Sequence, residues 1–177
     1  MAHPQQQNFC LKVKERFPNY FKNTKIFDVG SMDINGTNHF LFEGDYKYIG
    51  VDLIEGKNVD FVCRGHEYDT QDRFDVSIST ECFEHDEFWK ESFNNMYRLL
   101  KSGGLLLFTC AHDGRGEHGT TNSRPEDSPG VVLINDYYGN LNEQKYRENF
   151  NLDEMFTEYY FEVDYFVNDL YFYGIKK

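Results

Sequence analysis

The stretch that decides the fold is KIFDVGSMDINGTNHF, residues 25–40. It begins with a short apolar run that ends in Asp28 and Gly30, which is typical of a buried strand leading into a ligand-binding turn. Dinucleotide-binding turns carry the pattern G-x-G-x-x-G because their backbone must come close to a pyrophosphate. Here only Gly30 and Gly36 are present. The turn therefore does not fit a dinucleotide site. The question is which ligand would bind to a turn that is preceded by an acid, Asp28.

The composition predicts one domain of 177 residues with a full core, since 18% of the residues are aromatic. No apolar run approaches the roughly 20 residues that span a membrane, and the N-terminus MAHPQQQNFC does not resemble a secretion signal. The four cysteines are scattered without a C-x-x-C pair, so we expect reduced thiols. These features together predict a cytoplasmic protein without a membrane partner.

The net charge of −12 comes from 18 basic and 30 acidic residues. Proteins that bind nucleic acids need lysine and arginine to neutralise phosphates, so we expect no nucleic-acid partner. A local pocket for a small anion stays compatible with this charge. The acidity is otherwise explained by the need to keep an aromatic-rich chain soluble.

Apolar periodicity predicts alternating helices and strands over most of the chain. Such alternation favours βαβ units and a mostly parallel sheet. The expected strands are residues 25–30, 46–52, 59–63, 73–80 and 105–111, the expected helices 5–17, 36–43, 86–101 and 141–150, and a β-hairpin closes the chain. We expect a single domain, 1–177, with an N-terminal helix in 1–20, a core in 25–111, a loop on the substrate side in 112–140, and a helix and hairpin in 141–177.

Four motifs occur in order within residues 25–111: FDVGS, YIGVD, VSISTECFEH and MYRLLKSGGLLLFT. Together they resemble the class I S-adenosylmethionine-dependent methyltransferases, in particular small single-domain members with S-x-E-x-x-E-H after the fourth strand. The resemblance implies an α/β Rossmann-like fold with a mostly parallel seven-stranded sheet, a C-terminal antiparallel hairpin, and helices on both faces. It also implies S-adenosyl-L-methionine as cofactor and a small-molecule methyl acceptor as partner, for a monomer or a homodimer.

The implied cofactor answers the question about the acidic turn, because it carries no phosphate but has a cationic amino group, a sulfonium and ribose hydroxyls. An acid such as Asp52 at the end of a strand can accept hydrogen bonds from vicinal hydroxyls. Met32 and Ile34 replace later glycines of the family, so either their side chains point away from the ligand or the loop follows another path. The resemblance predicts that the cofactor is bound by Asp28, Gly30, Ser31, Asp52, Leu53, Gly65, His66, Thr80 and Glu81. Where the loop departs from the family pattern, Asp33 and Asn35 are additional polar candidates for the methionine end of the cofactor.

Catalysis of methyl transfer to oxygen or to a protonated nitrogen requires a base, and His85 beside Glu84, or His112, is our candidate. Glu84 and His85 could instead only cap or orient a helix. His112 and His118 lie in a polar loop whose spacing fits no zinc pattern, so we expect no metal.

Three alternatives to a methyltransferase are weighed. A nicotinamide-dependent oxidoreductase would need the missing glycine pattern. An aminopropyl transferase would need an additional N-terminal domain, for which the chain has no room. A non-catalytic methyltransferase-like protein that keeps the cofactor pocket stays open.

Overall fold

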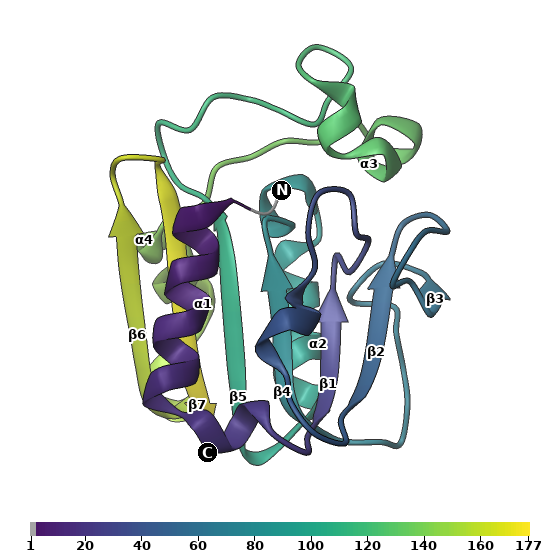
Figure 1. The fold of residues 1–177 in the computed structure, drawn as a ribbon. Coiled ribbons are helices and arrows are strands. Elements are labelled where there is room, and N and C mark those ends of the chain that lie inside the picture. The colour runs from purple at the N-terminus through teal and green to yellow at the C-terminus, as the bar shows by residue number, and fades with distance from the viewer. Residues whose placement is uncertain (1–2) are drawn as a thin grey trace.

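One sheet organises the part of the chain that this computed structural model describes, residues 3–177 (Figure 1). Its strand order is β3-β2-β1-β4-β5-β7-β6. The strands are β1 (Lys25–Val29), β2 (Lys47–Asp52), β3 (Phe61–Val62), β4 (Phe74–Thr80), β5 (Leu100–Ala111), β6 (Phe156–Asp164) and β7 (Asp169–Lys176). The pairs formed among β1 to β5 are parallel, and β7 is antiparallel to both β5 and β6. The predicted mostly parallel sheet with a terminal hairpin is confirmed.

The strand order reverses between β1 and β4. The chain runs outward from β1 to β3 and then returns to β4 on the other side of β1. Because these strands are parallel, their carboxyl ends meet at one edge of the sheet. Open α/β sheets bind ligands at such a reversal.

The helix α1 (Pro4–Arg16) covers one face of the sheet, across β5 and β7 (Figure 1). His3 caps its first turn, because the His3 ring accepts a hydrogen bond from the Gln6 amide. Phe9 and Val13 are buried against this face. Two short 3₁₀ segments, η1 (Pro18–Phe21) and η2 (Asn38–Leu41), complete the layer.

The opposite face is covered by α2 (Trp89–Leu99), α4 (Glu143–Asn149) and α5 (Leu152–Met155). Its core is aromatic: the rings of Phe108 and Tyr146 stack with their centroids 4.7 Å apart, and Phe93 packs against both. Three further segments are η3 (Phe83–His85), which follows β4, η4 (Pro125–Asp127) and α3 (Pro129–Ile134). Figure 1 shows α3 above the carboxyl edge of the sheet, where it can cover a ligand.

Two of the predicted helices are wrong in extent. Residues 36–43 contain only η2, because side chains bind the backbone there: the Asp33 carboxylate accepts from the Gly36 amide, and Thr37 Oγ1 accepts from the His39 amide. The helix expected over 86–101 ends at Leu99, and β5 begins at once with Leu100. The strand expected over 59–63 is reduced to the two residues of β3.

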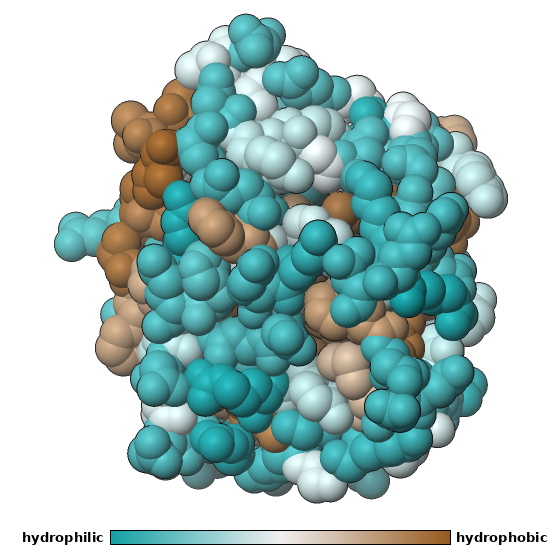
Figure 2. Space-filling view, turned by 180° about the vertical axis from the view of Figure 1, so that it is seen from behind, coloured by the Kyte–Doolittle hydropathy of each residue, from teal (hydrophilic) through white to brown (hydrophobic). Residues whose placement is uncertain are grey.

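The surface is largely hydrophilic on the face shown in Figure 2, with apolar side chains gathered along the edge where β3 lies. Exposed large apolar residues of the chain include Phe61, Val62 and Leu133. Within residues 3–177, no helix combines the length and the apolar character needed to cross a membrane.

Candidate functional site

A pocket lies at the carboxyl edge where the strand order reverses. It encloses about 1050 Å³ of empty space, its open mouth included. Most of its wall comes from residues 28–32, 34–38, 51–53, 63–65, 80–82, 85–86 and 127–131. These segments follow β1, β2, β3, β4 and β5, so the sheet positions the whole pocket.

The turn after β1 uses its own backbone amides within the protein. The amides of residues 30 and 31 both donate to the Val51 carbonyl, over 2.9 and 3.1 Å. The next two amides donate to the Asp52 carboxylate and to the Lys57 carbonyl, each over 3.0 Å. Phosphate-binding turns instead direct such amides at the ligand. This turn therefore presents none of these four donors to a phosphate.

Gly30 is the glycine that the turn requires. Its φ is +79°, and a Cβ at this position would lie 2.6 Å from both Cβ and Sγ of Cys82. Met32 and Ile34, by contrast, line the pocket. Their side chains therefore do not point away from the pocket, and the element that directly follows β1 is the 3₁₀ segment η2 and not an α-helix.

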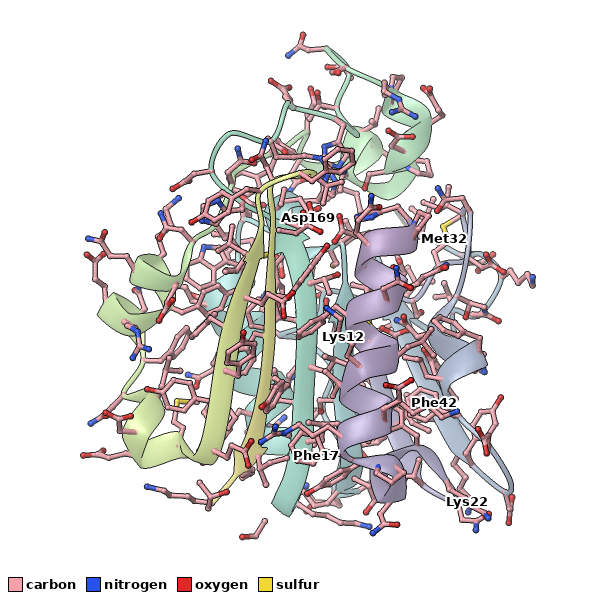
Figure 3. The ribbon with its side chains drawn as sticks, turned by 60° about the vertical axis from the view of Figure 1, so that its left-hand side comes forward. Lys12, Phe17, Lys22, Met32, Phe42 and Asp169 are labelled. Atoms are coloured by element: carbon pink, nitrogen blue, oxygen red, sulfur yellow. The ribbon has the colours of Figure 1, made fainter. Side chains whose placement is uncertain are left out.

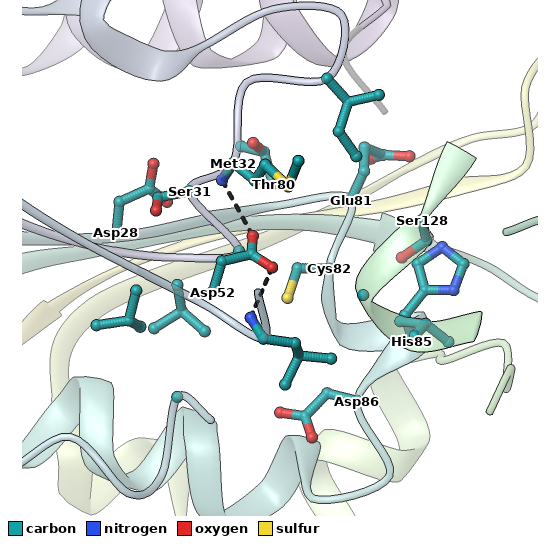
Figure 4. A pocket seen from close by; sticks show the side chains of 18 of the residues that line it. Asp28, Ser31, Met32, Asp52, Thr80, Glu81, Cys82, His85, Asp86 and Ser128 are labelled. Atoms are coloured by element: carbon teal, nitrogen blue, oxygen red, sulfur yellow. Dashed lines mark hydrogen bonds between the residues drawn. The ribbon is translucent and has the colours of Figure 1, made fainter. Parts of the chain in front are cut away.

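Asp28 is the next-to-last residue of β1, is buried, and lines the pocket (Figure 4). Its Oδ2 accepts hydrogen bonds from the Tyr48 hydroxyl and from Asn38 Nδ2, the latter over 3.2 Å. Its Oδ1 has no hydrogen-bond partner among residues 3–177. Burial raises the pKa of this carboxyl to about 7, although the two hydrogen bonds oppose the shift. Oδ1 of Asp28 can therefore accept a hydrogen bond from a cationic group of a ligand.

Asp52 ends β2 and uses both carboxylate oxygens to hold backbone amides, as the dashed lines in Figure 4 show. Oδ2 accepts from the Met32 amide over 3.0 Å, and Oδ1 accepts from the Leu53 amide over 2.7 Å. Burial raises the pKa of this carboxyl, and the two amides counteract that effect. Each oxygen keeps a further lone pair for a hydroxyl donor.

The end of β4 contributes Thr80, Glu81, Cys82, His85 and Asp86 to the pocket wall. Glu81 has a φ of +52°, an unusual backbone conformation for a residue other than glycine. Such outliers persist where the surrounding structure holds them, and they cluster at functional sites. Asp86 accepts from the Phe88 amide over 2.8 Å and from Ser92 Oγ, so it orients the start of α2.

The catalytic candidates differ in their access to the pocket. His85 lines the pocket, whereas Glu84 is fully buried behind it. Burial lowers the pKa of His85 to about 3, so its ring is neutral at pH 7. His112 is outside the pocket wall, with its ring against Tyr165. His118 approaches His85 instead, with ring centroids 5.0 Å apart.

The pocket includes most, but not all, of the residues that were predicted from the sequence to bind the cofactor. Asp33 pairs with Lys57 over 2.6 Å, and His66 packs on Phe88; neither lines the pocket. The remaining nine do: Asp28, Gly30, Ser31, Asn35, Asp52, Leu53, Gly65, Thr80 and Glu81. The roles of all eleven stay predictions.

Sequence reasoning missed Gln6, Asp86 and the segment 127–131, which also line the pocket. A signal existed for the last of these, because Pro129 occupies the first turn of α3, a position that favours proline. The run of Gly, Ser, Pro and Asp around it conceals so short a helix. Neither Gln6 nor Asp86 is marked by a motif, because Gln6 reaches the pocket through the packing of α1 on the sheet and Asp86 through the segment after η3.

Residues 27–108 match the family model described as methyltransferase domain. No protein of curated function matches the chain at the significance required. This match and the strand order of the sheet are consistent with the class I methyltransferase family that the motifs resemble.

Individual solved structures share the fold. A 1,6-didemethyltoxoflavin-N1-methyltransferase from Burkholderia thailandensis, with bound 1,6-didemethyltoxoflavin and S-adenosylhomocysteine, is 14% identical with a TM-score of 0.60, covering 100% of this chain and 92% of that chain. The N-methyltransferase NodS from Bradyrhizobium japonicum with S-adenosylhomocysteine is 12% identical, TM-score 0.63, covering 99% and 89%.

A third similar structure is phosphoethanolamine N-methyltransferase 2 from Haemonchus contortus with S-adenosyl-L-methionine. It is 18% identical with a TM-score of 0.65, and the match covers 96% of this chain and 52% of that chain. The chain thus spans about half the length of this protein. At these identities the likeness shows the fold alone.

Proposed function

We propose that the chain binds S-adenosyl-L-methionine in the pocket at the carboxyl edge and transfers its methyl group to a small-molecule acceptor. The family match supports a methyltransferase. Solved proteins of the same fold contain S-adenosylmethionine or S-adenosylhomocysteine. Two of them are named for small-molecule substrates, 1,6-didemethyltoxoflavin and phosphoethanolamine.

One observation carries the proposal. Two carboxylates, Asp28 and Asp52, lie at the ends of neighbouring strands in a pocket whose first turn offers no amides from residues 30–33 to a phosphate. A phosphate-bearing nucleotide would meet repulsion there. A nucleoside that carries positive charge fits, because the carboxylates attract its cationic end and accept from its hydroxyls.

The residues divide the ligand between them. The unpartnered Oδ1 of Asp28 would accept from the amino group of the methionine part, next to the close backbone at Gly30. Asp52 would accept from the ribose hydroxyls. The segment 63–65 and Asp86 supply polar groups for the adenine edge, and α3 would close over the nucleoside, since Gly130 lies against Leu53.

Methyl transfer requires little acid–base catalysis by the protein, because the sulfonium is already an activated methyl donor. The main contribution of the protein is to hold the two reactants in line and to exclude water. Glu81 and His85 border the pocket on the side away from Asp28 and Asp52 (Figure 4), and we assign the acceptor to that side.

The test is an activity screen. The chain is incubated with methyl-labelled S-adenosylmethionine and fractionated small metabolites, and the transfer of label to a metabolite is measured. We expect label in at least one fraction, and loss of this signal for Asp52→Asn. Binding of the cofactor without transfer to any fraction would favour a non-catalytic protein instead.

A further inference from the structure

Glu84, His85 and His118, here called the Glu-His-His cluster, come together behind the pocket. Glu84 and His85 belong to η3, directly after β4, and His118 comes from the loop that follows β5. One potential ligand atom from each side chain lies within 4.8 Å of the others. The three residues are only 0%, 5% and 7% exposed.

The cluster has polar atoms that the described chain does not satisfy. Both carboxylate oxygens of Glu84, Nδ1 of His85 and Nε2 of His118 have no hydrogen-bond partner within residues 3–177. The shortest approach between Glu84 and His118 is 3.9 Å, beyond hydrogen-bond distance. Buried polar groups are nearly always hydrogen-bonded, and an isolated buried carboxylate is strongly unfavourable. A ligand that satisfies them would remove this cost.

The surroundings of His118 fix its ring in the orientation of a metal ligand. Its Nδ1 lies 3.1 Å from the Gly116 carbonyl, so Nδ1 carries the proton and Nε2 presents a lone pair to the cluster. Metal-binding histidines typically donate their other ring N–H to a carbonyl or carboxylate in this way. The Tyr138 ring packs on both imidazoles, with centroids 5.1 and 5.5 Å away.

We propose that the Glu-His-His cluster binds a divalent transition-metal ion of the zinc type. Two imidazoles and one carboxylate are a ligand set that holds catalytic zinc and leaves one coordination position open. Bonds of about 2.0–2.2 Å require the three ligand atoms to approach each other somewhat more closely than they do here. A small shift of the loop that carries both His118 and Gly116 would bring Nε2 closer and keep the hydrogen bond that orients the ring.

A second grouping nearby, His3 with Glu81 and Asp169, does not share the need for a metal. His3 Nε2 lies 2.8 Å from Asp169, and Arg115 pairs with the same carboxylate over 2.5 Å. The charge of Asp169 is therefore already compensated by two cations from the chain. From the sequence we expected no metal, because the spacing of His112 and His118 fits no zinc pattern. The site proposed here does not use that pair, since His118 lies beside Glu84 and His85 of η3.

The position of the cluster gives the ion a role, which rests on the proposed function. His85 belongs both to the cluster and to the pocket wall. An ion held there would lie beside the acceptor side of the pocket. It would select acceptors whose nucleophilic oxygen, nitrogen or sulfur can coordinate a metal.

The test titrates Co²⁺ into tag-free protein that has been treated with a chelator. We expect one ion per chain, visible absorption bands of a low-symmetry site, and displacement of Co²⁺ by Zn²⁺. Glu84→Gln and His118→Asn should each weaken binding by at least about 100-fold. His112→Asn, from the same loop but outside the cluster, should bind as the unmodified chain does.

The site is overturned if the unmodified chain takes up no Co²⁺, or if Glu84→Gln and His118→Asn bind it as tightly as His112→Asn. Circular dichroism shows whether each variant is folded. If one variant does not fold, the other still tests the site. Calorimetry with S-adenosylhomocysteine on the chelated chain is read separately. Cofactor binding without metal binding overturns the metal site alone and leaves the proposed function standing.

Discussion

Asp52 accepts hydrogen bonds from the Met32 and Leu53 amides and lines the pocket, so in the proposed site it connects the fold to the ligand. Replacement by Asn keeps one acceptor for an amide but removes the charge. We expect Asp52→Asn to weaken S-adenosylhomocysteine binding by about 1–3 kcal/mol, the value of a hydrogen bond to a charged group. Calorimetry measures this. Glu55→Gln, an exposed acid close in sequence, is the matched control, and equal affinities of the two variants would contradict the ribose role.

We expect cofactor binding to depend on pH because of Asp28. Its pKa is raised to about 7 by burial, so a large share of the free protein has this carboxyl protonated near neutrality. A cation at Oδ1 favours the ionised form, and affinity should therefore rise with pH, approaching about tenfold per unit well below pH 7 and levelling above 8. Asp28→Asn should bind weakly at every pH. Calorimetry from pH 5.5 to 8.5 tests this, and a flat profile for the unmodified chain would count against contact with Asp28.

At the residue scale, the sequence predicted the position of the site better than its contacts. Asp28, Gly30 and Asp52 follow from strand ends, which apolar patterning reveals. Glu81 and His118 gain their neighbours only through long-range packing, between segments that no local pattern connects. His112 shows the same limit, since its distance from His85 depends on the path of a whole loop.

The start of α1 is tied to β7 by an ion pair, and Figure 3 shows Asp169 near that end of the helix. Burial lowers the pKa of His3, but the carboxylates of Asp169 and Glu81 outweigh it and raise the pKa to about 9. A pKa raised on folding stabilises the protein fully below the unfolded value of about 6.5. This stabilisation disappears as pH rises through 9.

His3→Gln should therefore lower the free energy of unfolding by about 1–2 kcal/mol at pH 6, because the pair is largely buried. The difference from the unmodified chain should shrink towards zero at pH 9.5. Urea unfolding at several pH values measures it. Lys12 of the same helix forms an exposed pair with Glu162 of β6, and Lys12→Gln should change little. A pH-independent effect of His3→Gln would contradict the assignment.

Helix α3 predicts a second element-scale result. A Cβ at Gly130 would lie 3.1 Å from Leu53 Cβ, so a larger side chain must push α3 away from the pocket. Overpacking of this kind costs about 1–3 kcal/mol. Gly130→Val should therefore raise the dissociation constant for S-adenosylhomocysteine about tenfold or more, as measured by calorimetry.

The control for this helix is Gly116→Val in the same connection, where a Cβ meets open space. It should bind the cofactor as the unmodified chain does. Unchanged affinity in Gly130→Val would show that α3 does not cover the nucleoside.

At the element scale, long periodic segments were predictable and short ones were not. α1 and α2 show their apolar faces in the sequence, whereas α3 has only six residues. The helix expected over 36–43 failed because Asp33 and Thr37 bind backbone amides, a competition that periodicity does not detect. β5 continues through Gly103 and Gly104, two residues that normally indicate a helix stop.

At the scale of the whole molecule, one sheet positions the proposed cofactor site. The sheet retains the complete strand order, although no α-helix lies between β1 and β4 in the described residues. Side-chain and backbone hydrogen bonds hold the turn after β1 against β2 and the segment after it. The topology was predictable from the alternation of elements and from the terminal hairpin. The hydrogen-bonded loop in place of the helix expected over 36–43 was not predictable.

A structure of the chain with bound S-adenosylhomocysteine tests the central claim most directly. We predict the ribose hydroxyls at the Asp52 carboxylate and the amino group of the ligand at Asp28 Oδ1, with α3 over the nucleoside. A ligand bound at another surface, or a ribose that makes no contact with Asp52, would contradict the account.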